Sequence, residues 1–296
     1  WDQLEEFANY CFNKSHAACY ALIAYWTAYL KAHYPDAFMA ALMTSDQDDT
    51  ERLAIEIAEC QRMGINVLPP DVNESFLEFA VVPHENKIRF GMVAVKGVGQ
   101  HAVEEVLEAR EREGKLDSIE KFARSVSTSR FNRKAWESLI KSGGFDQLED
   151  RKTLLNNLDT ITAFAQKIQK EAASGQTNIF GMLEEVSASV ESHLKLTPAP
   201  APGTQKEYLA WERELMGLYV SSHPLDNYTT YFTEQTVPLS RITPTIDGRP
   251  VTVGGIISTV RTIVTKSGTK MAFVKIEDKV HEAEIVVFPN LFEQVG

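Results

Sequence analysis

Two glycines separated by one residue stand directly before an amphipathic segment in the stretch VAVKGVGQHAVEEVLEAR. Such a tight turn directs its own backbone N–H groups, and those of the following helix, toward one point where the helix dipole favours an anion. Lys96 adds a positive charge, so the candidate phosphate-binding residues are Lys96, Gly97, Val98 and Gly99. On DNA, this arrangement grips a phosphate without reading a base. The alternative is a plain helical hairpin with a glycine cap.

A second glycine pair, Ser142-Gly143-Gly144, lies between two further helical patterns, which makes a weak internal repeat. This copy lacks the Gly-x-Gly form, and Asp146 and Glu149 lie close by. The second hairpin is therefore the poorer candidate for a phosphate site.

A third candidate, CFNKSHAACYA, stands at the entrance of a long apolar helix. Ser15 is a natural N-cap, and Lys14 together with free N–H groups of the first turn is able to hold a phosphate. The alternative is a helix cap beside a surface lysine.

The stretch AASGQTNIFGML places two bulky apolar residues, Ile179 and Phe180, side by side in what reads as a linker. A solvated linker avoids such a pair, because nothing there excludes water from it. Gln176, Ile179 and Phe180 have the form of a short peptide that docks one polar and two apolar side chains into a partner. Chance occurrence of the pattern is the alternative.

The sequence gives little support for a metal site or a catalytic nucleophile. Asp46, Asp48 and Asp49 lie in a polar loop before a helix, where capping explains them better than two-metal catalysis does. No P-loop or nucleophile elbow is present, and no metal site is expected. The cysteines, Cys11, Cys19 and Cys60, are too few and too irregular for a disulfide framework, and each is expected to be a small buried hydrophobe.

The composition belongs to a cytoplasmic, multidomain protein. The 296 residues are 44% hydrophobic and 24% charged, enough for two or three modest cores. A net charge of −11 excludes a wholly basic nucleic-acid binder but not local basic patches. No run approaches the ~18 apolar residues of a membrane helix, and the N-terminal residues of this sequence have no signal pattern, so no membrane partner is expected. Both ends read as cut, which indicates a fragment.

The periodicity predicts the elements that position these residues. Residues 1–64 read as helices, with HAACYALIAYWTAYLKAHYP apolar nearly all round and expected to be buried on most sides. Asp49 or Thr50 caps the next helix, which stops at Gly64. An extended, proline-punctuated connection then leads to a short strand pair, and residues 90–170 are expected to be helical again.

Order is expected to fail over residues 171–207, where LTPAPAPGTQ reads as a polyproline spacer. A short helix follows. After Pro250 the period changes to two, and three strands with glycine-containing turns predict part of an antiparallel barrel or sandwich.

Seven segments in this order, FNKSHAACYALIAYWTAYLKAHYP, LPPDVNES, GMVAVKGVG, LIKSGGFDQL, QTNIF, ERELMGLYVSSHPL and VTVGGIISTVRTIVTKSGTKMAFVKIED, resemble the later half of the bacterial C-family replicative DNA polymerases. The resemblance covers essentially the whole chain. It implies a multidomain α+β chain, mostly helical and ending in a truncated all-β OB-fold. The implied parts are the end of the fingers domain (1–85), a tandem helix-hairpin-helix domain (86–175), a clamp-binding peptide with linker (176–207), a connecting helix (208–249) and a partial OB-fold (250–296).

The resemblance also assigns roles to residues. Asn13, Lys14, Ser15 and His16 are expected to position phosphates of the incoming nucleotide, and the first hairpin to contact duplex DNA. The implied partner of Gln176, Ile179 and Phe180 is the sliding clamp (the beta subunit). Arg261, Lys266 and Lys270 are the candidates for single-stranded template, whereas Phe273 fits a core role better because it alternates with Met271 and Lys275.

The implied activity of the parent family is template-directed DNA synthesis from deoxynucleoside triphosphates with Mg²⁺, with primer-template DNA and other holoenzyme subunits as partners. The palm domain and its catalytic aspartates are absent from this sequence. No catalytic residue is therefore expected here, and this chain alone is expected to be inactive and to bind no cofactor.

Two other interpretations remain open. One is the error-prone paralogue of the same polymerase family, against which the clamp peptide argues. The other is a non-catalytic DNA-binding scaffold that combines helix-hairpin-helix and OB modules. NAD-dependent DNA ligases combine these modules too, but in another order and with a cysteine-rich zinc module that this sequence lacks.

Overall fold

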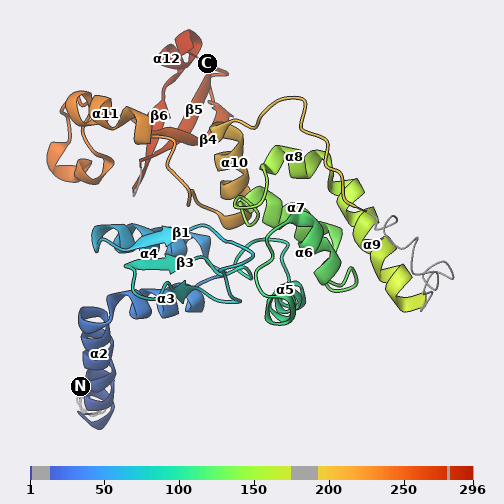
Figure 1. The fold of residues 1–296 in the computed structure, drawn as a ribbon. Coiled ribbons are helices and arrows are strands. Elements are labelled where there is room, and N and C mark those ends of the chain that lie inside the picture. Colours follow the sequence, from blue (N-terminus) through green and yellow to red (C-terminus); the bar gives the residue numbers. More distant parts are fainter. Residues whose placement is uncertain (2–13, 175–192, 279–280, 296) are drawn as a thin grey trace, which may run out of the picture. The chain divides into compact units, whose positions relative to one another are not determined.

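The computed structural model describes Trp1 and residues 14–174, 193–278 and 281–295 (Figure 1). Their contacts divide the chain into two units, Trp1–Ala199 and Pro200–Gly296. The expected fold class is confirmed, because helices dominate the first unit and the second carries a small antiparallel sheet. The described strands form two three-stranded sheets and no closed barrel. The five expected domain boundaries stay predictions.

In the described residues of the first unit there are eight helices and three very short strands. In chain order they are α2 (Lys14–His33), α3 (Pro35–Ser45), α4 (Thr50–Arg62), β1 (Asn66–Leu68), β2 (Ala80–Val81), β3 (Lys87–Arg89), α5 (Gln100–Glu113), α6 (Ile119–Ser125), α7 (Arg133–Ser142), α8 (Arg151–Asn156) and α9 (Leu158–Ser174). Of the two cap candidates for α4, the structure selects Asp49, whose Oδ1 accepts hydrogen bonds from the N–H groups of Glu51 and Arg52, each at 3.1 Å. Gly64, at φ +73°, follows the end of that helix as expected.

Helix α2 departs from the expected burial. Within the described residues it contacts α3, and Lys31 forms an ion pair with Glu59 of α4 at 2.8 Å. Cys19 is exposed, against expectation, while Cys60 is buried. An apolar surface all round a helix favours burial but does not supply the neighbours that would cover it. The exposed large apolar side chains of α2, each 46–63% accessible, are Tyr20, Leu22, Ile23, Tyr25, Trp26, Tyr29 and Leu30.

A three-stranded sheet replaces the expected strand pair. β3 lies between its neighbours, parallel to β1 and antiparallel to β2. The loop between β1 and β2 is fixed by Ser75, which donates to the carbonyl of Phe90 at 2.8 Å and accepts from the N–H of Asp71 at 3.0 Å. Asn73 in the same loop exchanges two hydrogen bonds with the backbone of Leu116. The sheet is thus joined to the helical region that follows it.

Four aromatic residues form the centre of the helical region. Phe122, Phe131, Trp136 and Phe145 are each at most 1% accessible, and their ring centroids lie 4.9–5.2 Å apart. Aromatic pairs at such distances contribute about 0.5–1.5 kcal/mol each beyond the area they bury. This cluster holds α6 and α7 together with the second hairpin.

Residues 90–99 are not helical, contrary to expectation. The N–H of Val95 bonds to the carbonyl of Met92, and that of Val98 to Val95, so the chain makes successive tight turns. Two glycines close together cost helical order because each gains backbone freedom when unfolded. The first hairpin is therefore preceded by tight turns, whereas the second hairpin is preceded by the helix α7.

The proline-rich segment is more ordered than expected. Thr197 exchanges two hydrogen bonds with the Asn157 side chain, at 2.9 and 2.7 Å, and the N–H of Leu194 donates to Glu120 at 3.0 Å. These contacts hold residues 193–199 against the helices of the first unit. Composition predicts weak intrinsic order but does not reveal such side-chain anchors.

The second unit begins with α10 (Gln205–Met216), which Thr204 and Glu207 start with a capping box. The elements that follow are η2 (Asp226–Tyr228), α11 (Thr229–Gln235), η3 (Leu239–Arg241), η4 (Pro244–Ile246), β4 (Ile256–Val264), β5 (Lys270–Glu277), β6 (Glu282–Val287) and α12 (Pro289–Val295). The three expected strands are confirmed and lie in the order β4-β5-β6, all antiparallel (Figure 1). Arg213 of α10 forms an ion pair with Glu277 of β5 and donates to the Tyr219 hydroxyl at 2.9 Å.

Within the described ranges, no helix combines the length and the apolar character that crossing a bilayer requires.

Candidate nucleic-acid interface

The first hairpin has the backbone that its glycines predict. Gly97 has a φ of +87°, a conformation that residues with a Cβ avoid. Gly99, at φ −81° and ψ 156°, is the N-cap of α5. Between them the Val98 side chain is 5% accessible and anchors the turn in the core, whereas Lys96, Gly97 and Gly99 are exposed. The apolar residue thus holds the turn in place while the two glycines face outward.

The N-terminus of α5 is open to an anion. A Cβ built on Gly99 meets no atom within 4 Å, so a ligand is able to approach the backbone. The first turn of α5 carries no acidic residue. Among the described contacts, the backbone N–H groups of Gln100 and His101 have no backbone acceptor. Exposed N–H groups at the positive end of a 14-residue helix are an anion-binding arrangement.

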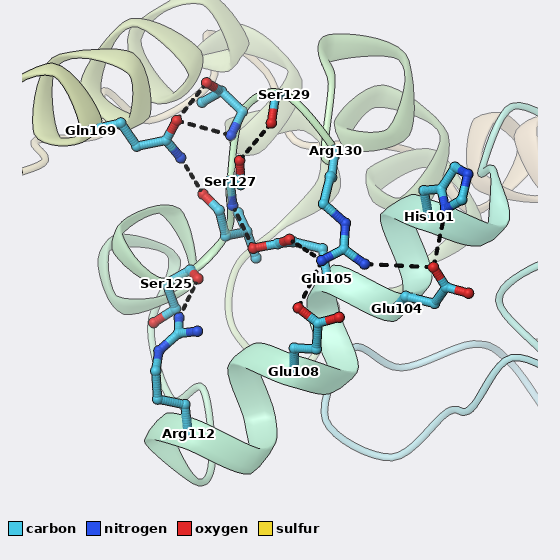
Figure 2. Close-up of polar contacts among 12 residues, drawn as sticks. His101, Glu104, Glu105, Glu108, Arg112, Ser125, Ser127, Ser129, Arg130 and Gln169 are labelled. Carbon is cyan, nitrogen blue, oxygen red and sulfur yellow. Dashed lines mark hydrogen bonds and ion pairs between the residues drawn. The ribbon is translucent and has the colours of Figure 1, made fainter. Parts of the chain in front are cut away.

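The nearest acidic residue on α5 is already paired. Glu104 accepts a hydrogen bond from the side chain of His101 at 3.1 Å (Figure 2). It accepts a second from the side chain of Gln100 at 2.8 Å. These bonds, His101 first, hold the pKa of Glu104 below its usual value. The Glu104 carboxylate is therefore bound by side chains of its own helix.

The hairpin rests on α7. A Cβ built on Gly97 would lie 2.6 Å from Ser138 Oγ and 2.9 Å from Lys134 Cε. Lys134 and Ser138 are four residues apart and therefore share one face of the helix. Neither was among the residues singled out from the sequence. The i, i+4 spacing in RKAWES was the available signal, but nothing in it shows that the first hairpin lies against this face.

The second hairpin is occupied by the chain itself. Gly143, in the left-handed region at φ +92°, is buried under the guanidinium of Arg151. Arg151 is 3% accessible and binds Asp146 through two hydrogen bonds, at 2.8 and 2.7 Å, and donates to the carbonyl of Lys141 at 2.9 Å. The Asp146 carboxylate thus lies against the second hairpin at Gly143, whereas the first hairpin is open at Gly99.

Figure 2 shows the polar contacts that fix the loop between α6 and α7. The loop between α6 and α7 is held from α5 by Glu105, which accepts a hydrogen bond from the N–H of Ser127 at 2.8 Å. From α9, Gln169 donates to the carbonyl of Val126 at 2.7 Å and accepts from Thr128. Both hairpins are therefore carried by one cross-linked body.

Arg130 in the same loop is neutralised by three carboxylates. It lies 2.7 Å from Glu108, 3.0 Å from Glu105 and 3.5 Å from Glu104. The guanidinium lowers the pKa of Glu108. Arg130 is for this reason a structural cation rather than a candidate phosphate ligand.

The β-sheet of the second unit brings one pair of the expected residues together. Arg261 of β4 is the cross-strand partner of Phe273 of β5, and its guanidinium lies 4.9 Å from the ring centroid. The core role expected for Phe273 is wrong, because Ala272 and Ile276 are the buried residues of β5 and Phe273 lies on the opposite face. Lys266 lies in the turn and Lys270 begins β5 on the other face, so neither joins Arg261.

Several predicted residues receive no such test. Asn13 and the peptide Gln176, Ile179 and Phe180 lie outside the described residues, as does Cys11. Lys14 is the first described residue of α2. Ser15 is therefore inside the helix, and its expected N-cap role is wrong. His16 is exposed and packs against Tyr20, with ring centroids 4.4 Å apart.

Two aspartates of the α3–α4 loop, Asp46 and Asp49, contact α4. Asp46 forms an ion pair with Arg52 at 3.1 Å, and Asp49 caps the helix. Elsewhere in the described residues, no group of three or more His, Cys, Asp or Glu side chains gathers in a way that would hold a metal ion. Burial, followed by a hydrogen bond with Asp46, raises the pKa of Glu56 to about 7. Burial raises the pKa of the Cys60 thiol to about 12, which leaves it unreactive.

Comparison with known proteins agrees with this geometry. Residues 64–154 match the family described as "Helix-hairpin-helix motif", which spans the sheet, both hairpins and the start of α8. The chain is 39% identical over 305 residues to the DNA polymerase III subunit alpha of Saccharopolyspora erythraea. It is 38% identical over 298 residues to that of Haemophilus influenzae and 37% identical over 298 residues to that of Escherichia coli K12.

These matches cover 99–100% of the chain but about 25% of each relative, so the chain spans about a quarter of their length. The expected resemblance is confirmed. Along its whole length, the chain is thus related in sequence to a quarter-length segment of the bacterial DNA polymerase III alpha subunits, and its residues 64–154 match the helix-hairpin-helix motif.

Proposed function

We propose that this chain is the part of a DNA polymerase III alpha subunit that grips duplex DNA and tethers the enzyme to the sliding clamp during template-directed DNA synthesis. The observation that carries the proposal is the open first hairpin, where exposed glycines and the free N–H groups of α5 face solvent beside Lys96. It rests on sequence similarity to polymerase subunits as well.

The hairpin suits a phosphate in charge, shape and specificity. Its donors are backbone N–H groups, which bind a phosphate oxygen of any nucleotide and read no base. The absence of a side chain at Gly99, where a Cβ would meet no atom within 4 Å, lets a phosphate reach the backbone. A polymerase that moves along DNA requires such sequence-independent contacts.

The chain as a whole repels DNA. Its net charge is −11, so attraction has to come from local sites, and binding is expected to be weak and strongly salt-dependent. The second hairpin, closed by the Arg151–Asp146 ion pair, is not expected to contribute.

Two variants at one position test the hairpin. Gly99→Asp and Gly99→Asn both place a good N-cap side chain in open space, so both are expected to fold. They differ in one negative charge, at the point where the phosphate would lie. Binding of labelled duplex DNA by the whole chain is measured by fluorescence anisotropy at several salt concentrations.

The expected result is that Gly99→Asp binds at least about tenfold more weakly than Gly99→Asn at low salt, with the difference shrinking as salt rises. Equal binding by the two variants, or a wild-type isotherm insensitive to salt, would remove the hairpin from the interface.

The clamp tether is proposed from sequence alone. Gln176, Ile179 and Phe180 form a docking peptide of one polar and two apolar anchors. Binding of the chain to its cognate clamp is compared with that of a Gln176→Ala, Phe180→Ala double variant. The variant is expected to lose about 2 kcal/mol or more, as anchor residues do. Equal binding by both chains would contradict the tether and would favour the error-prone paralogue or the scaffold.

The remaining roles follow from the same proposal. The Arg261–Phe273 pair offers a cation and an aromatic face to single-stranded template, whereas Lys266 in the turn and Lys270 on the opposite face of β5 would contact the strand separately. Asn13, Lys14, Ser15 and His16 position phosphates of the incoming nucleotide in the assembled enzyme.

The described part of this chain does not fit Mg²⁺, because no group of three or more His, Cys, Asp or Glu side chains there could hold the ion. We place the metal chemistry in the portion of the longer relatives that the chain does not match.

A further inference from the structure

Helix α7 lies against the first hairpin, a contact that no pattern in the sequence predicted. Two side chains one helical turn apart, Lys134 and Ser138, lie under Gly97. The first hairpin is therefore seated on a helix that belongs to the second repeat. A ligand at the first hairpin meets both repeats.

Lys134 extends along the glycine. Its Cγ and Cε lie 3.4 and 2.9 Å from the position that a Cβ of Gly97 would occupy. The ammonium group is one bond beyond Cε, and Lys134, like Lys96, is exposed. Among the described residues, the Lys134 ammonium has no hydrogen bond or ion pair. The nearby carboxylate of Glu137 is bound to Lys141 at 2.6 Å, and Lys134 acts on it only as a more distant positive charge.

Ser138 supplies an independent sign of a ligand. Its side chain is 1% accessible, and Oγ has no hydrogen-bond partner in the described structure. Leaving a buried hydroxyl unpaired is unfavourable, so such a group indicates a water or anion that completes it. The same Oγ lies 2.6 Å from the Cβ position of Gly97, directed at the hairpin.

We infer that Lys134 is a phosphate-binding residue of the first hairpin, so that one backbone phosphate of duplex DNA is held between Lys96, Lys134 and the N-terminal N–H groups of α5. The inference rests on the proposed duplex-binding function and adds a ligand from the second repeat. It gives the second repeat a part in DNA binding although Arg151 and Asp146 close its own hairpin.

Lys134→Gln tests the inference, with Lys115→Gln as matched control. Both lysines are exposed, but Lys115 lies just past the opposite end of α5, about 20 Å from Gly99 at 1.5 Å per residue. Duplex binding by the whole chain is measured from about 50 to 200 mM salt. Loss of one phosphate contact reduces the slope of log K against log salt by about 0.9, so the affinity ratio of wild type to Lys134→Gln changes about threefold over this range.

Lys115→Gln is expected to keep the wild-type slope. If both glutamine variants keep it while Gly99→Asp still weakens binding, Lys134 is not a ligand and the duplex-binding function stands. If Gly99→Asp binds like Gly99→Asn, the proposed function fails first. Lys134→Arg keeps the charge and is expected to retain most of the slope, which separates loss of a contact from loss of the fold.

Discussion

Gly97 and Gly99 are two residues apart, yet the fold constrains them differently. Gly97 combines a positive φ with contact against α7, so any Cβ would be strained and would collide with Ser138. Gly99 has an ordinary extended conformation and open space around it. The first glycine is required by the fold, and the second is free to serve a ligand.

We predict that Gly97→Ala lowers the free energy of unfolding by about 1–3 kcal/mol, and that Gly99→Ala lowers it by less than about 1 kcal/mol. Urea unfolding of the two variants beside the wild type measures the difference. Similar stability of the two variants would show that the hairpin backbone relaxes away from α7.

Glu56 makes stability depend on pH. Its pKa in the folded chain is about 7, against an ordinary value of 4.5, because burial and the Asp46 carboxyl disfavour its charge. Between those values the folded chain binds more protons than the unfolded chain, so the contribution of Glu56 to the free energy of unfolding falls as pH rises and levels off above 7.

Glu56→Gln removes that dependence. The free energy of unfolding of the variant, relative to that of wild type, is expected to rise by about 1–2 kcal/mol between pH 5 and pH 8. This figure allows for screening by solvent around Glu56 and Asp46. Urea unfolding at both pH values measures it, with Glu51→Gln, at an exposed position of the same helix, as control. A constant difference between wild type and Glu56→Gln across this range would contradict the raised pKa.

At the scale of elements, the loop between α6 and α7 decides how the two repeats are joined. Glu105 and Glu108 both contact Arg130, but Glu105 is 6% accessible and also binds the N–H of Ser127, whereas the side chain of Glu108 is 56% exposed. Burial makes the first interaction costly to break, and solvent weakens the second.

We predict that Glu105→Ala lowers the free energy of unfolding by about 2–3 kcal/mol and Glu108→Ala by less than about 1 kcal/mol. Thermal or urea unfolding of the whole chain compares them. Equal losses would mean that Arg130 pairing, rather than the buried bond to the loop backbone, stabilises this junction.

At the scale of the whole molecule, the hairpin that we propose to bind DNA is present without a centre for nucleotidyl transfer in the residues described. No three acidic, histidine or cysteine side chains gather there to hold a metal, and phosphoryl transfer by polymerases depends on metal ions. DNA binding and synthesis are therefore expected to separate in this chain.

We predict that the purified chain binds primer-template DNA but incorporates no nucleotide when supplied with deoxynucleoside triphosphates and Mg²⁺. A primer-extension assay measures incorporation, and anisotropy on the same preparation shows that the protein is active in binding. Template-dependent extension above a no-template control would overturn this expectation.

Local patterns in the sequence determined much of this protein. The Gly-x-Gly turn before α5, the cap at Asp49 and the three antiparallel strands follow from backbone freedom, hydrogen-bonding side chains and alternating burial, which act between near neighbours. The order of seven motifs was sufficient for the family resemblance that the comparisons confirm.

Tertiary structure decided which side chains meet. The seat of Gly97 on Lys134 and Ser138, the closure of the second hairpin by Arg151 and the pairing of Arg261 with Phe273 join residues whose neighbours along the chain give no sign of the contact. The exposed apolar surface of α2 shows the same limit, since its residue types favour burial while burial requires a neighbour. Side-chain contacts between distant segments depend on how packed elements are placed in space, and that placement is not contained in any local period or spacing.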